Sequence, residues 1–374
     1  MPSVKPIILA GAGVVHAGVL RLQAQHHGIA GPISVVSASA QTPYSGMLPG
    51  WIAGHYHADE INLNFARLSQ AAGARLIVGQ IDDLVLPAQQ LSLEGGQRLG
   101  FGLLSLNVGA VQSPPSATNL LALRPFTRLL TRLDQWLVWA RHQPERPLSV
   151  IVVGAGGAGF EVALALRYRL RQLQPQRALQ LRLLASSDQA LDAQCLGAQR
   201  LAARALHEHG IELLTQIRVQ AMDGQVIRAS QRGQDLRLSA DLIIWAGGAQ
   251  AAPWLASSGL ACDALGFVQV NADLRSRSHA NILASGDCAS FSVPVPKAGV
   301  YAVRQAAVLY QNLVALSRGQ TELKNYQPAR RALSLFATGP QSAIASWGPL
   351  SVAGRWVWRW KNQIDRNFLL KHRP

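Results

Sequence analysis

Short apolar runs, most of them rich in β-branched residues, alternate along this chain with stretches whose apolar residues recur at helical spacing. The most uniform run, residues 150–153, is typical of a strand buried on both faces of a sheet. Residues 192–209 and 300–316 have helical spacing, and residues 81–101 alternate as in a small antiparallel meander. We expect further buried strands at residues 6–10, 33–36, 75–78, 103–108, 181–184, 241–248 and 282–287. Strands that alternate with helices predict an α/β fold with parallel sheets.

A glycine-rich turn follows the strand predicted at residues 150–153. Gly154, Gly156 and Gly159 stand in the spacing GxGxxG, and an apolar helical stretch begins directly afterwards. Such a turn lets the backbone approach a pyrophosphate, and the helix that follows presents unpaired N–H groups to the phosphates. The pattern therefore predicts a dinucleotide-binding site, the alternative being an ordinary turn of another α/β protein.

A similar turn follows the strand predicted at residues 6–10. Gly11 and Gly13 fill the first two glycine positions, but His16 occupies the third. The third glycine normally allows close packing of helix against strand, so we expect His16 to push the helix slightly outwards. The chain thus has room for two nucleotide domains.

Neither strand after these turns ends in the acidic residue that usually binds a ribose. The first ends at Ser37, and the second is followed by Ala-Ser-Ser at residues 185–187. Arg182 lies within the second strand and is not an obvious ligand for a 2′-phosphate. The sequence therefore leaves the choice between NADH and NADPH open.

Residues 42–56 form a segment rich in glycine and aromatic residues, TPYSGMLPGWIAGHY. This composition is incompatible with a simple helix or strand, and such loops at the carboxyl edge of a doubly wound sheet usually contact a ligand. The alternative is that Tyr44, Met47 and Trp51 only pack the loop.

Residues 329–374 are expected to form a separate, basic unit. Within residues 353–370, every fourth position is apolar, and arginine and lysine surround these positions, which are Trp356, Trp360, Ile364 and Phe368. Such an amphipathic helix is typical of an anchor at a membrane interface. The spacing equally fits a helix whose tryptophans pack on the body or on a second copy of the chain, as in a homodimer.

The net charge and the cysteine spacing indicate which partners the chain could bind and which kinds of site it could contain. The net charge of +15 over 374 residues favours anionic partners such as nucleotides or an anionic membrane surface. Cys195, Cys262 and Cys288 are too widely spaced for a CxxC metal site or a disulfide framework, which suits a reducing cytoplasm. We predict no metal site and no membrane-spanning helix, so any contact with a membrane would be at its surface.

Several segments together resemble one family along nearly the whole chain. They are TPYSGMLPG, the RPF segment at residues 124–126, the EVALALR that follows the second glycine turn, PKAGVYAVRQ, and the tail WRWKxxIDRxF. The chain resembles the pyridine nucleotide-disulfide oxidoreductases, and among them the type II NADH dehydrogenase-like flavoproteins that are also found fused to selenide, water dikinase. Its length leaves no room for the kinase, so we expect a free-standing module.

The resemblance implies two doubly wound, Rossmann-like domains. An NAD(P)H-binding domain at residues 121–247 would be inserted into an FAD-binding domain at residues 1–120 and 248–328, followed by a short basic C-terminal region at residues 329–374. The residues that the resemblance assigns to FAD are Gly11, Gly13, His16, Ser37, Tyr44, Arg124, Pro125, Gly286, Asp287 and Ala298. Among these, Asp287 would bind the ribityl chain. Asn107 stands where this group has an aspartate, which puts the flavin contacts of that position in doubt.

The resemblance also implies the residues around NADH or NADPH. Gly154, Gly156 and Gly159 would hold the pyrophosphate, and Glu161 would lie near the nicotinamide. The helix after Lys297 would point its N-terminus at the flavin, and Gln305 would lie where these enzymes approach a quinone.

The activity implied is transfer of hydride from NADH or NADPH to FAD, followed by electron transfer to a second acceptor, with a quinone the first choice. Without a cysteine pair, a disulfide acceptor and sulfide oxidation through a persulfide are disfavoured. Two alternatives remain: a soluble NAD(P)H reductase of a small selenium or sulfur compound, and a non-catalytic flavin-binding interaction protein.

No nucleic-acid-binding motif is present. The expected location is the cytoplasm, with peripheral attachment to the inner face of the membrane.

Overall fold

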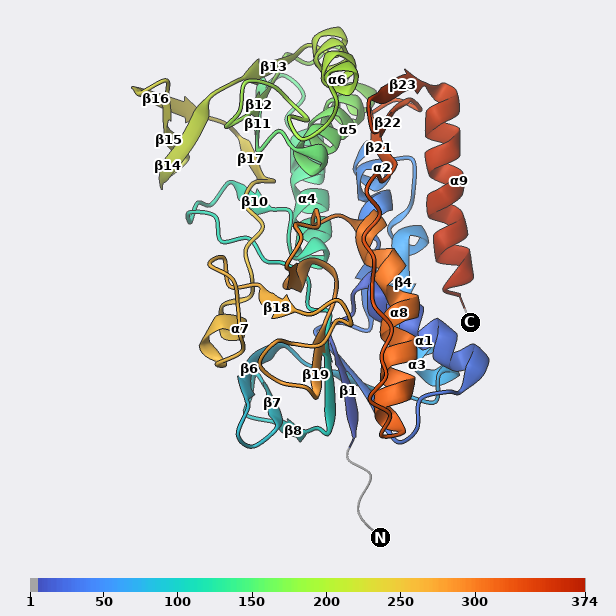
Figure 1. The fold of residues 1–374 in the computed structure, drawn as a ribbon. Coiled ribbons are helices and arrows are strands. Elements are labelled where there is room, and N and C mark those ends of the chain that lie inside the picture. Colours follow the sequence, from blue (N-terminus) through green and yellow to red (C-terminus); the bar gives the residue numbers. More distant parts are fainter. Residues whose placement is uncertain (1–5, 374) are drawn as a thin grey trace.

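The computed structural model describes residues 6–373 and contains two parallel sheets of five strands each (Figure 1). In the first sheet β1 lies in the middle, and Ile7 pairs with Ile33 of β2 on one side and with Leu103 of β9 on the other. The strand order is β19 (Ile282–Ala284), β9 (Leu103–Leu106), β1 (Ile7–Ala10), β2 (Ile33–Ser37) and β5 (Arg75–Val78).

Alternate residues of β1 are buried in different clusters on the two faces of this sheet. Ile7 and Leu9 pack with the helices, whereas Ile8 and Ala10 pack with a layer of short strands. The helices are α1 (Val14–His26), α3 (Phe65–Ala71) and α8 (Gly299–Ser317). The other layer contains β6 (Ile81–Val85), β7 (Gln90–Leu93), β8 (Arg98–Gly100), α7 (Pro253–Ser257), β18 (Val268–Val270) and β20 (Ala289–Phe291).

The second sheet repeats this plan around β11, whose Val150 and Val152 face helices while Ile151 and Val153 face an antiparallel sheet. Its strand order is β10 (Leu120–Ala122), β17 (Leu242–Trp245), β11 (Leu148–Val153), β12 (Leu179–Leu184) and β13 (Ile211–Leu214). The helices are α4 (Phe126–Arg141), α5 (Gly157–Leu173) and α6 (Leu196–Glu208). The antiparallel sheet contains β14 (Ile217–Asp223), β15 (Val226–Gln231) and β16 (Gln234–Ser239).

The second sheet interrupts the first along the chain, because β1 to β9 precede it and β19 follows it. Figure 1 shows the second sheet above the first. The predicted α/β class with two Rossmann-like units is confirmed. We propose that the domain boundaries are those expected from the sequence, at residues 120, 247 and 328.

Some predicted elements differ from those observed. The helix expected at residues 192–209 begins only at Leu196, because residues 190–193 form a turn. The segment between β13 and β17 forms the three-stranded antiparallel sheet β14 to β16. The 42–56 segment includes a short helix, α2 (Leu48–Ala53), between β3 (Gln41–Pro43) and β4 (Asn62–Asn64).

The C-terminal part has its own small antiparallel sheet and a long helix, and it packs on both Rossmann-like units. Phe336 lies against Gly157 of α5, and Phe368 packs against the core of the first sheet. The elements are β21 (Ser334–Ala337), β22 (Ala343–Trp347), β23 (Leu350–Gly354) and α9 (Arg355–Lys371). Figure 1 shows α9, in red, along one side of the molecule.

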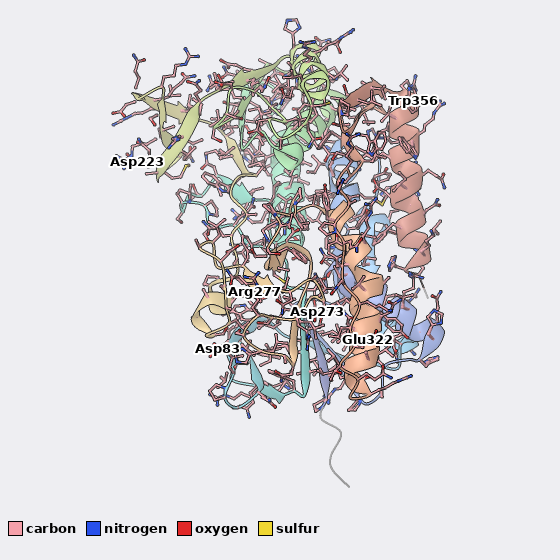
Figure 2. The ribbon with its side chains drawn as sticks, viewed as in Figure 1. Asp83, Asp223, Asp273, Arg277, Glu322 and Trp356 are labelled. Carbon is pink, nitrogen blue, oxygen red and sulfur yellow. The ribbon has the colours of Figure 1, made fainter. Side chains whose placement is uncertain are left out.

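The tryptophan face of α9 points away from the body. Trp356 is 56% exposed and Trp360 is 43% exposed, and their rings stack on one another. The buried face of α9 is formed instead by Val357, Lys361, Asp365 and Leu369. Figure 2 shows Trp356 at the outer edge of the molecule. The exposure of Trp356 and Trp360 therefore contradicts the packing of these two side chains on the body, and leaves a membrane interface and a second copy of the chain as the alternatives. No helix within residues 6–373 combines the length and apolar character that a membrane span requires.

Candidate functional site

The glycine turn after β11 is closed on one side and open on the other. A Cβ atom on Gly154 would lie 2.9 Å from the Gly247 nitrogen, and one on Gly159 would collide with the Gly154 carbonyl oxygen. A Cβ on Gly156, the N-cap of α5, would meet no described atom within 4 Å. The turn thus packs tightly against its own domain while Gly156 faces open space, as close approach of a pyrophosphate requires.

The glycine turn after β1 is fixed from behind by side chains. Gly11 has a φ of +100°, and a Cβ on Gly13 would collide with the Asn107 side chain. His16 is fully buried, with Nδ1 2.7 Å from the Gly11 carbonyl and Nε2 2.8 Å from the Ser105 hydroxyl. Burial lowers the pKa of His16 to about 4, so it is neutral, with Nδ1 donating to the carbonyl. His16 therefore supports the turn rather than offering a charge to a phosphate.

An ion pair connects the segment between β10 and α4 with the Gly-Asp turn after β19. Arg124 donates from Nη2 to the Asp287 carboxylate at 2.8 Å and from Nη1 to the Ala110 carbonyl at 3.3 Å. Gly286 has a φ of +66° and donates its N–H to the Gln305 side chain at 2.7 Å. Two predicted FAD residues that are 163 positions apart are thus brought together.

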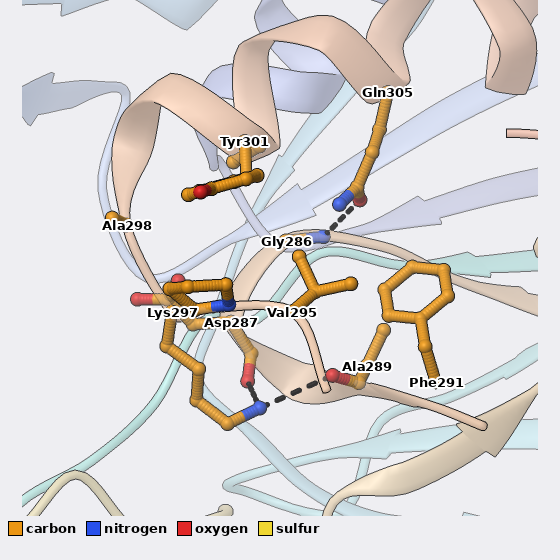
Figure 3. Close-up of a pocket in the computed structure, with 11 residues that line it drawn as sticks. Gly286, Asp287, Ala289, Phe291, Val295, Lys297, Ala298, Tyr301 and Gln305 are labelled. Atoms are coloured by element: carbon orange, nitrogen blue, oxygen red, sulfur yellow. Dashed lines mark hydrogen bonds between the residues drawn. The ribbon is translucent and has the colours of Figure 1, made fainter. Parts of the chain in front are cut away.

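The N-terminus of α8 covers a small cavity beside this turn (Figure 3). Lys297 lies along the cavity and donates to the carbonyls of Asp287 at 2.7 Å and Ala289 at 3.1 Å. The amine also lies 3.5 Å from the centre of the Phe267 ring, and burial lowers the pKa of Lys297. Lys297 therefore connects the turn after β19 to the segment before α8. Gln305 is buried and engaged with Gly286, so its approach to an electron acceptor stays a prediction.

Glu161 lies beyond the first turn of α5, where the positive end of the helix dipole no longer stabilises a carboxylate strongly. Its carboxylate accepts the Ala337 N–H at 2.7 Å, and it faces Lys361 and Asp365 of α9. Lys361 donates to Asp365 at 2.8 Å and to the Gly46 carbonyl at 2.6 Å. Burial raises the pKa of Glu161 to about 7, although the Lys361 ammonium opposes the shift. The carboxyl group thus titrates near neutral pH where α5, α9 and the 42–56 segment meet.

Replacing Glu161 by glutamine is expected to change how stability depends on pH. Because the pKa of Glu161 is raised from 4.5 to about 7, the folded state binds this proton more tightly than the unfolded state. The carboxyl group therefore stabilises the fold at low pH, and this contribution is lost as pH rises through about 7. Thermal melts should show Glu161→Gln close to wild type at low pH and more stable above neutral pH.

The matched control is Glu94→Gln, which changes an exposed glutamate in the turn between β7 and β8 and should leave the pH profile unchanged. A lower melting temperature of Glu161→Gln at high pH would mean that the ionised Glu161 is stabilised by Lys361, contrary to this prediction.

The aromatic residues of the 42–56 segment pack against α9. The Tyr44 ring stacks on Phe368 with centroids 4.5 Å apart, and the Tyr56 hydroxyl donates to Asn362 at 2.7 Å. Met47 is fully buried. These contacts favour the packing alternative for the loop, and no described contact of Tyr44 points to a ligand role.

The residues that follow β2 and β12, where the two riboses would bind, differ in whether their serine hydroxyl is already hydrogen-bonded. The Ser37 hydroxyl donates to the Ser39 carbonyl at 2.8 Å, whereas Ser186 after β12 is exposed. Arg182 is paired with Glu212 at 3.1 Å.

A family model described as pyridine nucleotide-disulphide oxidoreductase matches residues 9–308. The chain is 25% identical over 324 residues to the type II NADH:quinone oxidoreductase NdhA of Mycobacterium tuberculosis, covering 78% of this chain and 68% of that protein. Its fold is similar to the sulfide:quinone oxidoreductase of Aquifex aeolicus, with a TM-score of 0.80, 18% identity, and coverage of 99% of this chain and 91% of that one. It is also similar to NDH2 of Plasmodium falciparum in complex with NADH, with a TM-score of 0.75, 14% identity and 99% coverage of both chains.

Proposed function

Since the chain belongs to the pyridine nucleotide-disulphide oxidoreductase family, whose members bind FAD and NADH or NADPH, we propose that it passes electrons from NAD(P)H through FAD to a quinone. The observation that carries this proposal is a pair of glycine turns, each after the middle strand of a doubly wound sheet. In such sheets, ligands bind at the carboxyl end of the strand where the direction of winding reverses. β1 and β11 occupy this position in their sheets.

The residues around the first turn fit FAD. Gly11 and Gly13 would let its pyrophosphate approach α1, and Asp287 would bind the ribityl hydroxyls. The N-terminus of α8, beginning at Gly299, would face the flavin ring and favour negative charge on it. Bound FAD supplies the chemistry of hydride acceptance, while the chain's own groups bind and orient it and exclude water.

The residues around the second turn fit the nicotinamide nucleotide. Gly156 is open to its pyrophosphate, and α5 begins directly after it. Glu161 lies four residues further along α5, where its protonated carboxyl group would be available near neutral pH. We propose that Glu161, together with Lys361, holds a proton close to the place where the quinone accepts electrons.

The simplest test is the visible spectrum of the purified protein, followed by anaerobic titration with NADH and NADPH. We expect bound flavin that is bleached by a stoichiometric amount of at least one nucleotide. A colourless preparation that does not take up added FAD would overturn the proposal.

A quinone is favoured as the second acceptor because apolar side chains are exposed on the C-terminal unit. The large ones are Trp347, Leu350, Val352, Trp356, Trp360, Ile364 and Leu370. Such a patch on a soluble protein marks an interaction surface, and the basic residues around it complement an anionic membrane, where quinones reside. We therefore propose that α9 docks on the membrane surface. No contact within residues 6–373 favours a selenium or sulfur compound as the acceptor.

Removing the two exposed tryptophans of α9 should weaken membrane binding. Burying one large apolar side chain contributes roughly 1.5–3 kcal/mol, so the double variant Trp356→Ala, Trp360→Ala should bind anionic vesicles at least about tenfold more weakly. Co-sedimentation with vesicles measures this. The control is Trp139→Ala on α4, which removes a tryptophan that is 36% exposed outside the C-terminal unit. Equal binding of the double variant and wild type would disprove docking through α9.

A further inference from the structure

The carboxyl end of β12 carries polar groups in place of an acidic residue. In nucleotide-binding sheets, the residue just after this strand contacts the adenosine ribose, and an acid there binds the 2′-hydroxyl of NADH. Here Ala185 is buried and Ser186 is exposed. A 2′-phosphate would therefore meet no carboxylate directly at the strand end.

The Ser186 hydroxyl has no hydrogen-bond partner within residues 6–373. The equivalent hydroxyl in the first sheet, that of Ser37, is already bound to the Ser39 carbonyl at 2.8 Å. Of the two serines that replace ribose-binding acids, only Ser186 has its hydroxyl available for a ligand.

An arginine from a distant turn is connected by hydrogen bonds to the loop that follows this strand. Arg232 lies in the turn between β15 and β16 and donates from Nε to the Gln216 side chain at 2.9 Å. Gln216 in turn donates its backbone N–H to the Ser187 carbonyl at 3.1 Å. The two terminal nitrogens of Arg232 have no partner in the described chain, and the residue is exposed. A guanidinium whose two outer nitrogens are unpaired is thus linked, through Gln216, to the loop that carries Ser186 and Ser187.

The nearest acidic residue on the same loop, Asp188, is hydrogen-bonded to the glutamine that contacts Arg232. Asp188 accepts from the Gln216 amide at 2.5 Å, and Gln216 also holds Arg232. Asp188 therefore helps to position the guanidinium by way of Gln216.

We propose that Ser186 and Arg232 bind the 2′-phosphate of NADPH, so that the second site prefers NADPH to NADH. The inference rests on the proposed nucleotide site and deepens it. Arginine suits this role because its planar, permanently charged group donates two parallel hydrogen bonds to a phosphate. Ser186 would add a hydroxyl donor to the same group.

The test uses calorimetry to measure how tightly the purified flavoprotein binds two nucleotides, adenosine 2′,5′-bisphosphate and adenosine 5′-monophosphate. The bisphosphate should bind the wild type at least about tenfold more tightly, as expected for a charge-assisted hydrogen bond to a phosphate. Arg232→Ala should remove this advantage, and Ser186→Asp should reverse it by repulsion. The control Arg228→Ala changes an exposed arginine within the neighbouring strand β15 and should retain the advantage.

The same variants are compared for flavin reduction by NADPH and by NADH, and only the NADPH rate should fall in Arg232→Ala. Equal binding of the two adenosine nucleotides by the wild type, or an unchanged preference in Arg232→Ala, would overturn the assignment even if NADH reduces the flavin. If the bisphosphate binds as expected while neither NADH nor NADPH reduces the flavin, the phosphate site stands and the proposed electron transfer fails.

Discussion

Asp287→Ala is expected to yield protein that no longer retains FAD. The Asp287 side chain is only 15% exposed and lies in the turn after β19, where Arg124 holds it at 2.8 Å. Hydrogen bonds to charged groups contribute roughly 1.5–3 kcal/mol each, so if Asp287 binds the ribityl hydroxyls as proposed, its loss should weaken FAD binding at least about a hundredfold. The variant also leaves Arg124 without its counter-ion. The ratio of flavin absorbance to protein absorbance after purification measures the effect.

The control for this experiment is Asp223→Ala, which removes an exposed aspartate at the end of β14, far from the first sheet (Figure 2). It should keep the flavin content of the wild type. Arg124→Ala should have a smaller effect than Asp287→Ala, because it removes the residue that orients the carboxylate but keeps the carboxylate itself. Full flavin content in Asp287→Ala would show that the ribityl role is wrong.

The parts of the fold that could be predicted from the sequence are those determined by neighbouring residues. The turn from Gly154 to Gly159 is contiguous, and its spacing fixes the strand, the turn and the helix together. The same holds for α9, where a four-residue spacing places Trp356 and Trp360 on one face. The spacing could not say which face is buried, because Lys361 and Asp365 are charged and yet lie against the body. The Lys361 ammonium lies 2.8 Å from the Asp365 carboxylate, and this ion pair offsets the cost of burying the two charges.

The contacts that assemble the candidate site could not be predicted, because they join residues that are far apart in sequence. Arg124 meets Asp287, Glu161 meets the α9 residues, and Arg232 is linked through Gln216 to the loop after β12. Arg232 had no signal in the sequence except its place beside a glycine in a turn. The same limit applies to Gln305, whose position in a helix was predicted but whose bond to Gly286 depends on tertiary packing.

Gly156→Val is expected to abolish flavin reduction by either nucleotide while FAD stays bound. Gly156 has a φ of −67°, which any residue can adopt, and a Cβ there would meet no described atom within 4 Å. The protein should therefore fold normally, and the added side chain should collide only with the pyrophosphate of the nucleotide. We expect the rate of anaerobic flavin reduction at a fixed nucleotide concentration to fall at least about a hundredfold, since close approach of the backbone to the phosphates is lost.

Two glycine variants separate this steric effect from damage to the fold. Gly100→Val, at the end of β8, adds the same side chain where a Cβ again meets no described atom within 4 Å, and it should reduce flavin as the wild type does. Gly159→Val would drive a side chain into the Gly154 carbonyl and should lower the melting temperature, which Gly156→Val should not. Wild-type reduction rates in Gly156→Val would show that the nucleotide does not bind at this turn. Loss of flavin from the same variant would show instead that the two turns have been assigned to the wrong ligands, because the open position at α5 would then belong to FAD.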